Sequence, residues 1–259
     1  MPRKIKKKAV KKEVNSGKII LITAGIIMGV IVLLLIILAI VQSVGKNGES
    51  ENSAIQTSTA STVSTASSEP SAEQSVPDFL KDVEIDASKT YYADIDVEDY
   101  GKITVKLEPS AAPITVKNFV YLANSGFYNG LTFHRIMQGF MMQGGDPNGN
   151  GTGGSENKIY GEFAQNGFNN PISHQKGVIS MARNSGDMNS ASSQFFICHT
   201  GNHTASLDGK YAAFGQVTEG MEIVEKICNE AEPIDNNGTI PADQQPVINS
   251  ITIRTEAIS

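Results

Sequence analysis

The chain has 259 residues, enough for one sizeable domain with additional segments. It carries 21 Lys and Arg against 27 Asp and Glu, a net charge of −6, and this composition excludes a collagen-like or wholly disordered protein. The charge is uneven, because residues 1–18 hold eight basic side chains and one acidic one, which leaves 13 basic and 26 acidic residues, or −13, beyond them. Nucleic acid is bound mainly through Lys and Arg, so we expect no nucleic-acid partner for this acidic body.

Residues 19–41 form a stretch of 23 residues without a charged side chain, rich in Ile, Leu and Val. About 20 such residues cross the hydrocarbon core of a bilayer, so the stretch predicts a transmembrane helix. A cleaved signal peptide is the alternative, but its apolar region usually spans about 7–15 residues and no clear cleavage site follows Val41. The preceding basic residues predict a single-pass protein of the cell membrane, with residues 1–18 as a cytoplasmic tail and the C-terminal bulk outside the cytoplasm.

Residues 42–80 have the composition of a tether. Within residues 50–75, 13 of the 26 residues are Ser or Thr, interleaved with Ala, Glu and Gln. Such a segment cannot bury enough apolar surface to offset the entropy lost on ordering, so it predicts a disordered linker. The folded domain is then expected over residues 81–259.

Short apolar runs separated by Gly, Asn, Asp and Pro follow. Residues 102–107 alternate between apolar and polar side chains, which predicts a strand with one buried face. Pro113 and Gly126 bracket apolar residues at helical spacing, so a helix is predicted over residues 114–124, and a second over 220–229. Further strands are predicted at residues 131–134, 178–182, 194–199, 212–217 and 247–254. The pattern predicts a mainly β domain, in which a closed antiparallel barrel is favoured over a sandwich because closure removes exposed edges.

Several familiar kinds of site are not supported by the sequence. Cys198 and Cys228 lack the clustered spacing of a zinc site and are interpreted as structural thiols. The four histidines form no HExxH signature, and no G-x-S-x-G motif is present. The glycine-rich residues 148–154 do not end in GK[ST], so a surface loop is a better interpretation than a phosphate-binding loop. Hydrolase and metalloenzyme functions are therefore disfavoured.

Four strings in the same order resemble the cyclophilin family of peptidyl-prolyl cis-trans isomerases: FHRIMQGFMMQGGDP at 133–147, SMAR at 180–183, SSQFFIC at 192–198 and LDGKYAAFG at 207–215. The resemblance spans roughly residues 82–256. Several long strings in register are far more specific than one short motif. The resemblance implies a closed eight-stranded antiparallel β-barrel capped by two α-helices.

The resemblance also implies a chemistry without metal or cofactor. Resonance makes an X-Pro amide resist rotation, with a barrier of about 18–20 kcal/mol. A hydrogen bond donated to the prolyl nitrogen favours the twisted transition state, and Arg135 matches the family's catalytic arginine. The implied catalytic residues are Arg135, Phe140 and Gln143, and the implied substrate-binding residues are His134, Met141, Ala182, Arg183, Gln194, Phe196, Leu207 and Tyr211.

The chain departs from the family pattern at three positions. Tyr211 stands where a histidine is often found, and its hydroxyl can still donate to a substrate carbonyl. Arg183 stands where many members have asparagine, and the added charge could alter the preference for the residues before proline. Ser206 stands where several eukaryotic members have tryptophan, which implies weakened binding of cyclosporin, a cyclic peptide inhibitor of many members.

Together these features predict a membrane-anchored, extracytoplasmic isomerase that accelerates proline-limited folding of exported or surface proteins, with proline-containing polypeptides as its partners. The alternative is a binding module or holdase chaperone that grips proline-containing segments with little turnover. The intact residues Arg135, Phe140, Gln143 and Phe196 favour the enzyme.

Overall fold

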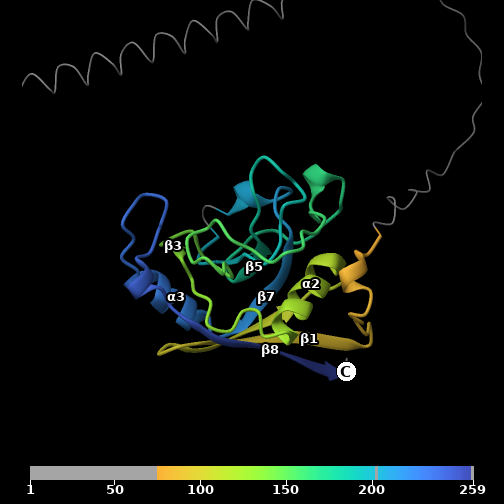
Figure 1. Cartoon of the computed structure of the whole chain (residues 1–259), viewed down its shortest axis with the longest axis horizontal. Helices are drawn as coiled ribbons and strands as arrows, with labels where there is room; N and C mark the ends of the chain where they lie inside the picture. The colour runs from red at the N-terminus through yellow and green to blue at the C-terminus, as the bar shows by residue number, and fades with distance from the viewer. Residues whose placement is uncertain (1–74, 202–203, 258–259) are drawn as a thin grey trace, which may run out of the picture. The chain divides into compact units, whose positions relative to one another are not determined.

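The computed structural model of the chain describes residues 75–201 and 204–257. The regular elements, in chain order, are η1 (Asp78–Leu80), β1 (Lys89–Val97), β2 (Gly101–Leu107), α2 (Pro113–Asn124), β3 (Arg135–Met137), β4 (Met141–Gly144), η2 (Ala164–Asn166), β5 (Val178–Met181), β6 (Phe195–Cys198), η3 (Ala205–Leu207), β7 (Ala213–Glu219), α3 (Met221–Glu230), η4 (Ala242–Gln244) and β8 (Ile248–Ala257), where η marks a 3-10 helix. Figure 1 shows their arrangement.

The strands form one sheet in the order β3-β4-β6-β5-β7-β2-β1-β8, and every neighbouring pair is antiparallel. Along β1 each second residue is buried, so one face of the strand packs on the core. All four residues of β5 and of β6 are buried. The prediction of a mainly β domain with eight antiparallel strands and two helices is thus confirmed.

The predicted closure into a barrel is wrong, because β3 and β8 are the two edges of the sheet and share no ladder. The backbone next to β3 is occupied by a loop instead: Ile136 N–H donates to Gly238 O at 2.8 Å, and an isolated bridge joins Arg135 to Thr239. On this side the start of β8 meets residues that precede β3: Ile248 N–H donates to Leu131 O at 2.7 Å, and an isolated bridge joins Thr132 to Val247. A loop in place of β8 therefore covers the edge of this three-residue strand.

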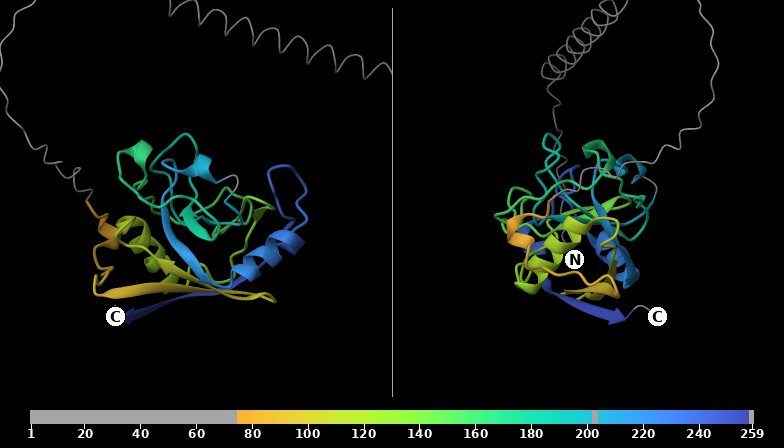
Figure 2. Two further views of the ribbon diagram at one scale, coloured as in Figure 1. Left: turned by 180° about the vertical axis from the view of Figure 1, so that it is seen from behind. Right: turned by 90° about the vertical axis from the view of Figure 1, so that its right-hand side faces the viewer.

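The two helices lie at opposite ends of the sheet (Figure 2). Helix α2 begins with Pro113 at its first turn, as predicted, and buries Phe119 among the rings of Tyr128, Phe195 and Phe214. Helix α3 follows Gly220, whose φ of 81° lies in the left-handed region. A Cβ there would come within 2.5 Å of a backbone oxygen in β2, so only glycine fits this close approach.

Both cysteines are buried and unpaired. Burial raises the pKa of the Cys198 and Cys228 thiols to about 12, so both stay protonated at neutral pH. This placement agrees with their interpretation as structural thiols.

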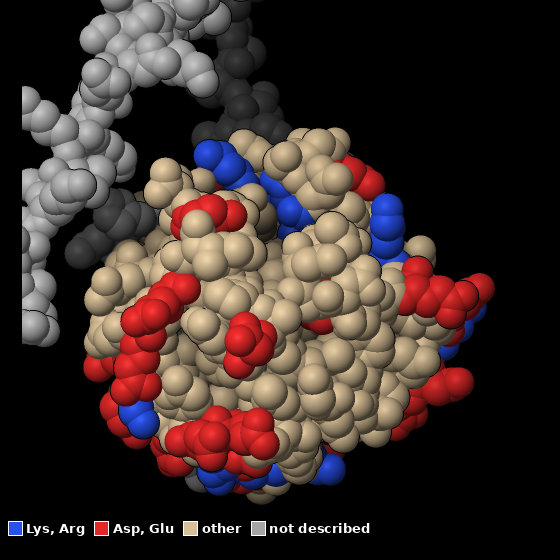
Figure 3. Space-filling model, turned by 60° about the vertical axis from the view of Figure 1, so that its left-hand side comes forward, with Lys and Arg blue, Asp and Glu red and all other residues tan. Residues whose placement is uncertain are grey.

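Within residues 75–201 and 204–257, no helix is both long and apolar enough to cross a membrane. The predicted span at 19–41 and the basic tail lie outside the described residues, as does most of the predicted linker. The last part of that linker is described, and there η1 places Leu80 fully buried against the core. On the face seen in Figure 3, acidic side chains form several separate clusters, in keeping with the acidic composition of the domain.

Candidate active site

Arg135 is positioned by the hairpin of β3 and β4. The register of that pair sets Arg135 opposite Gln143, and the guanidinium Nη1 donates to Gln143 Oε1 at 3.1 Å. Nε donates to the backbone oxygen of Asn237 at 2.7 Å, which fixes the plane of the guanidinium from the other side. Burial lowers the pKa of Arg135, but an arginine stays charged at any physiological pH. The result is a fixed cationic donor at the edge of the sheet.

A small pocket of about 90 Å³ opens beside this guanidinium. Its lining consists of nine residues that the sequence had assigned to the site: Arg135, Phe140, Met141, Gln143, Ala182, Arg183, Phe196, Leu207 and Tyr211. They come from β3, β4 and the turn between them, from β6 and η3, and from the loops that follow β5 and η3. The apolar side chains of this lining can enclose a small apolar ring, and its polar side chains can meet the amide that the ring carries.

The remaining two assigned residues lie outside that lining. Gln194 accepts a hydrogen bond from Gln143 Nε2 at 2.8 Å and donates to Gly153 O at 2.7 Å, so it supports the glutamine beside Arg135 from behind. His134 is buried, with only 3% of its surface exposed, and neither ring nitrogen has a partner among the described residues. Burial lowers the pKa of His134, which keeps the ring neutral. The structure thus gives His134 no contact with the pocket.

The glycine-rich loop at residues 148–154 wraps around a buried carboxylate. Asp146 accepts hydrogen bonds from the backbone N–H groups of Asn148, Asn150 and Gly151. Burial alone would raise the pKa of Asp146, but these donors outweigh it and the pKa is lowered. Because the donors are already satisfied by the protein's own carboxylate, they are not available to a phosphate group.

Phe196 is held in the pocket wall by two other rings. Its ring meets Tyr211 edge to face, with centroids 5.9 Å apart, and lies parallel to the His174 imidazole at 6.0 Å. Phe196 also belongs to a compact apolar cluster beneath the pocket, together with Met141 and Leu207. The part of the wall around Phe196 is therefore closely packed.

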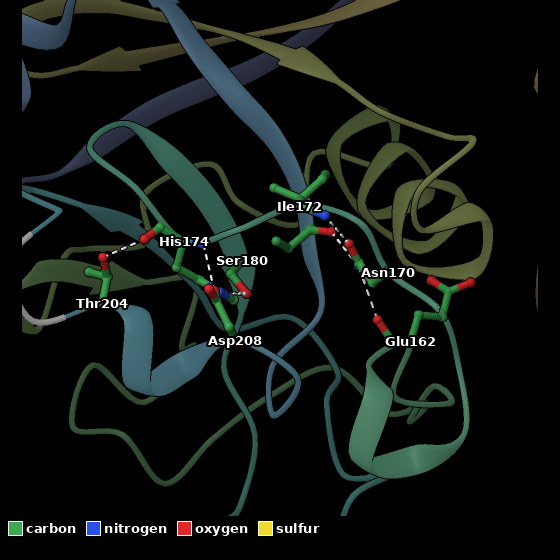
Figure 4. Close-up of polar contacts among 8 residues, drawn as sticks. Glu162, Asn170, Ile172, His174, Ser180, Thr204 and Asp208 are labelled. Carbon is green, nitrogen blue, oxygen red and sulfur yellow. Dashed lines mark hydrogen bonds and ion pairs between the residues drawn. The ribbon is translucent and has the colours of Figure 1, made fainter.

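His174 belongs to a polar network that the sequence analysis did not select, in which His174 and Ser180 are buried and Asp208 is partly exposed (Figure 4). Its Nδ1 lies 2.8 Å from Asp208 Oδ1, and its Nε2 lies 3.0 Å from Ser180 Oγ. Because the carboxylate can only accept, Nδ1 carries the proton and Nε2 accepts from the serine. Burial lowers the pKa of His174, so the ring stays neutral. Ser180 is fully buried, so this Ser-His-Asp set cannot reach a substrate, and its role is to hold the imidazole against Phe196.

Ser180 and Asp208 lie inside two of the quoted strings, but His174 lies in none, and no local pattern shows that the three side chains meet. Among the described residues, no group of three or more His, Cys, Asp or Glu side chains is arranged to hold a metal ion.

Comparison with protein families gives a match over residues 92–255 to the cyclophilin type peptidyl-prolyl cis-trans isomerase/CLD family. Among curated relatives, a peptidyl-prolyl cis-trans isomerase of Helicobacter pylori is 45% identical over 146 residues, which cover 56% of this chain and 85% of the relative. Peptidyl-prolyl cis-trans isomerase B of Bacillus subtilis is 46% identical over 133 residues, or 51% of this chain and 87% of the relative.

Solved structures agree with this result. A cyclophilin type peptidyl-prolyl cis-trans isomerase of Cryptosporidium parvum, crystallised in the presence of the dipeptide Ala-Pro, superposes with a TM-score of 0.55 at 29% identity. The match covers 64% of this chain and 99% of that one. From its motifs, its pocket and these matches, the chain belongs to the family of cyclophilin-type peptidyl-prolyl cis-trans isomerases.

Proposed function

We propose that this isomerase acts on exported or surface proteins, held at the outer side of the cell membrane by its N-terminal segment. The observation that carries the chemistry is the fixed Arg135 guanidinium beside an apolar pocket. The anchor is supported by the sequence: the uncharged residues 19–41, the basic residues before them and the Ser/Thr-rich segment after them.

The pocket supports amide rotation in a simple way. The proline ring binds among Phe140, Met141, Phe196 and Leu207, which removes apolar surface from water. As the amide twists, its nitrogen loses conjugation and becomes a hydrogen-bond acceptor, and the guanidinium of Arg135 donates to it. This bond is stronger in the twisted state than in the planar one, so it lowers the barrier without any proton transfer or covalent step.

Gln143 fixes the donor and supplies a contact to the substrate. Its Oε1 accepts from Arg135 and its Nε2 donates to Gln194, so both ends of the amide are held in one orientation. A donor that is positioned before the reaction needs no reorganisation when charge develops on the substrate. The row of side chains from Arg135 to Gln194 thus preorganises the site.

The membrane anchor predicts a specific pattern of proteolysis. Protease added to intact cells or protoplasts should cut the Ser/Thr-rich segment that begins near residue 42, before η1, because an unfolded tether is accessible to protease. The fragment released should carry the whole isomerase domain, while a cytoplasmic marker protein stays intact as the control. A mature protein that lacks residues 19–41 in untreated cells would contradict the anchor and support a cleaved signal peptide.

Cyclosporin is expected to bind weakly. Ser206 lies on η3 directly before Leu207, and it places a short hydroxyl where the indole N–H of sensitive members would stand. Loss of one hydrogen bond costs about 1–3 kcal/mol, which corresponds to about fivefold to 150-fold in affinity. Titration of the inhibitor should show a clear gain in affinity for Ser206→Trp and none for Ala205→Trp, which places the same ring one residue earlier. Tight inhibition of the unmodified chain would contradict this expectation.

A further inference from the structure

Arg183 follows β5, and its guanidinium is fixed in place. Nε donates to the backbone oxygen of Lys210 at 2.8 Å, and Nη1 donates to the backbone oxygens of Asn184 and Ser185 at 2.9 and 3.2 Å. The group also lies over two aromatic faces, 4.9 Å from the ring centre of Tyr211 and 5.0 Å from that of Phe163. Three carbonyls and two rings therefore hold this cation in one orientation.

Within the described part of the chain, this cation has no carboxylate partner. None of the ion pairs within residues 75–201 and 204–257 includes Arg183. Its bonds use Nε and Nη1 and go to neutral oxygens, so the donors of Nη2 are not engaged by the described part of the chain. In a domain with a large excess of acidic residues, a fixed arginine without a carboxylate retains its capacity to bind an anion.

Arg183 stands where a substrate would leave the proline pocket. It lines that pocket, and it also lines a neighbouring polar groove of about 480 Å³. The two hollows share Gln143, Ala182 and Arg183, so a peptide with its proline in the pocket and a neighbouring residue in the groove passes this guanidinium. The other charged groups of the groove are Lys158 and Asp187, whose charged atoms lie 3.8 Å apart and offset each other.

We propose that Arg183 selects substrates that carry a carboxylate side chain, Asp or Glu, within two residues of the proline. This inference deepens the isomerase activity and rests on it. The planar guanidinium matches a carboxylate, and its fixed orientation reduces the side-chain entropy that an ion pair normally costs. A second positive charge, Arg135, lines the same pocket and adds to the local positive potential.

Two peptide series test the proposal with the full chain in a non-ionic detergent. One series, Ala-Xaa-Pro-Phe, varies the residue before proline, and the other, Xaa-Ala-Pro-Phe, varies the residue two before it, with Glu, Gln or Lys at Xaa. Isomerisation is followed by NMR exchange, which needs no coupling protease. In at least one series we expect kcat/KM to be about fivefold higher for the Glu peptide than for the Gln peptide, which is the upper range for a partly exposed ion pair. The Lys peptide should have a lower kcat/KM than the Gln peptide.

The variants give this preference a specific signature. Arg183→Gln should bring the ratio of kcat/KM for the Glu peptide to kcat/KM for the Gln peptide close to one. The change should appear mainly as a higher KM for the Glu peptide, because the lost ion pair stabilises the bound substrate and the transition state equally. Arg183→Glu should make kcat/KM higher for the Lys peptide than for the Glu peptide. The matched control is Lys210→Gln, which removes an exposed cation from the neighbouring loop but keeps the backbone oxygen that Arg183 uses, and it should leave the ratio unchanged.

A measurement on the unmodified chain guards against variants that fail to fold. Raising the ionic strength should reduce its preference for Glu, because the pair is partly exposed and is screened by salt. Equal kcat/KM for Glu, Gln and Lys in both series would overturn the proposal, and so would a preference for Glu that survives in folded Arg183→Gln. Absence of turnover on every peptide would overturn the isomerase activity itself.

Discussion

Replacement of Arg135 by alanine is expected to lower kcat/KM for X-Pro isomerisation by about 10²–10³, while the domain stays folded. The estimate follows from other preorganised donors that meet developing charge, whose removal costs about 2.7–4 kcal/mol. Arg135 donates to Gln143 and to the Asn237 backbone, but it fills no position of the main apolar core. The substitution should therefore lower the rate of isomerisation and leave the stability of the domain nearly unchanged.

The assay can use a fragment of residues 75–259, because a solved relative consists almost entirely of the matched region. Arg254→Ala is the matched control, since it removes an arginine from β8 that pairs with Asp94 rather than lining the pocket. Arg135→Lys keeps the charge but loses the fork that reaches both partners, so it should also be slow. Near-normal turnover by Arg135→Ala would assign the chemistry to another group.

The same variant separates the enzyme from the holdase alternative. Suppression of client aggregation depends on the apolar pocket, which Arg135→Ala leaves in place. An enzyme should lose turnover and keep this binding. A chain that suppresses aggregation equally with and without the arginine, and that shows no turnover in either form, would be a binding module.

The pocket could be predicted from the sequence because its parts lie in contiguous strings. Phe133 to Pro147 includes β3, β4 and the turn between them, so one motif supplies both the donor and its glutamine partner. Ser192 to Cys198 includes β6, which pairs directly with β4 and brings Phe196 beside Gln143. Local sequence therefore sets most of the lining.

Parts of the fold were not predicted, some in spite of a clear local pattern and others because no local pattern exists. Strand β1 was missed although Tyr91, Ala93, Ile95 and Val97 alternate with polar or exposed residues, a pattern as clear as that of β2. The predicted strand at 131–134 is reduced to two isolated bridges at Thr132, and the ladder starts at Arg135. The edge position of β3 depends on the loop around Gly238, more than 100 residues away, and no local pattern encodes that contact.

The supports of the site were also beyond local patterns. His174 and Asp208 are 34 residues apart in the sequence, and both read as loop residues. The contact between these two side chains depends on how η3 packs against the segment before β5, and that packing is part of the tertiary structure. Motif matching located the residues that line the pocket, whereas the residues that hold them in place became visible only in the structure.

Glu162 is the support with the largest expected effect on stability. Its side chain is fully buried, and its carboxylate accepts hydrogen bonds from the backbone N–H groups of Ile114 at 2.9 Å and Thr115 at 2.8 Å. These donors belong to the first turn of α2, where a helix has no internal acceptors, and Ala112 at the N-cap offers no side-chain bond. A residue 47 positions away thus caps the helix. Burial raises the pKa of the Glu162 carboxyl, whereas the two backbone donors at the positive end of the helix favour its ionised form.

Glu162→Ala should lower the free energy of unfolding by about 2–6 kcal/mol, because it leaves two buried donors unsatisfied at about 1–3 kcal/mol each. Glu162→Gln keeps the size but turns an amide NH₂ toward one of the donors, so it should recover only part of the loss. Glu156→Ala, an exposed acid in the preceding loop, is the control and should stay within about 0.5 kcal/mol of the unmodified fragment. Urea unfolding of the three variants measures these differences, with equal slopes showing that the same surface is exposed. An unchanged midpoint for Glu162→Ala would mean that water or another group satisfies the start of α2, and that the buried carboxylate is not what holds this helix on the sheet.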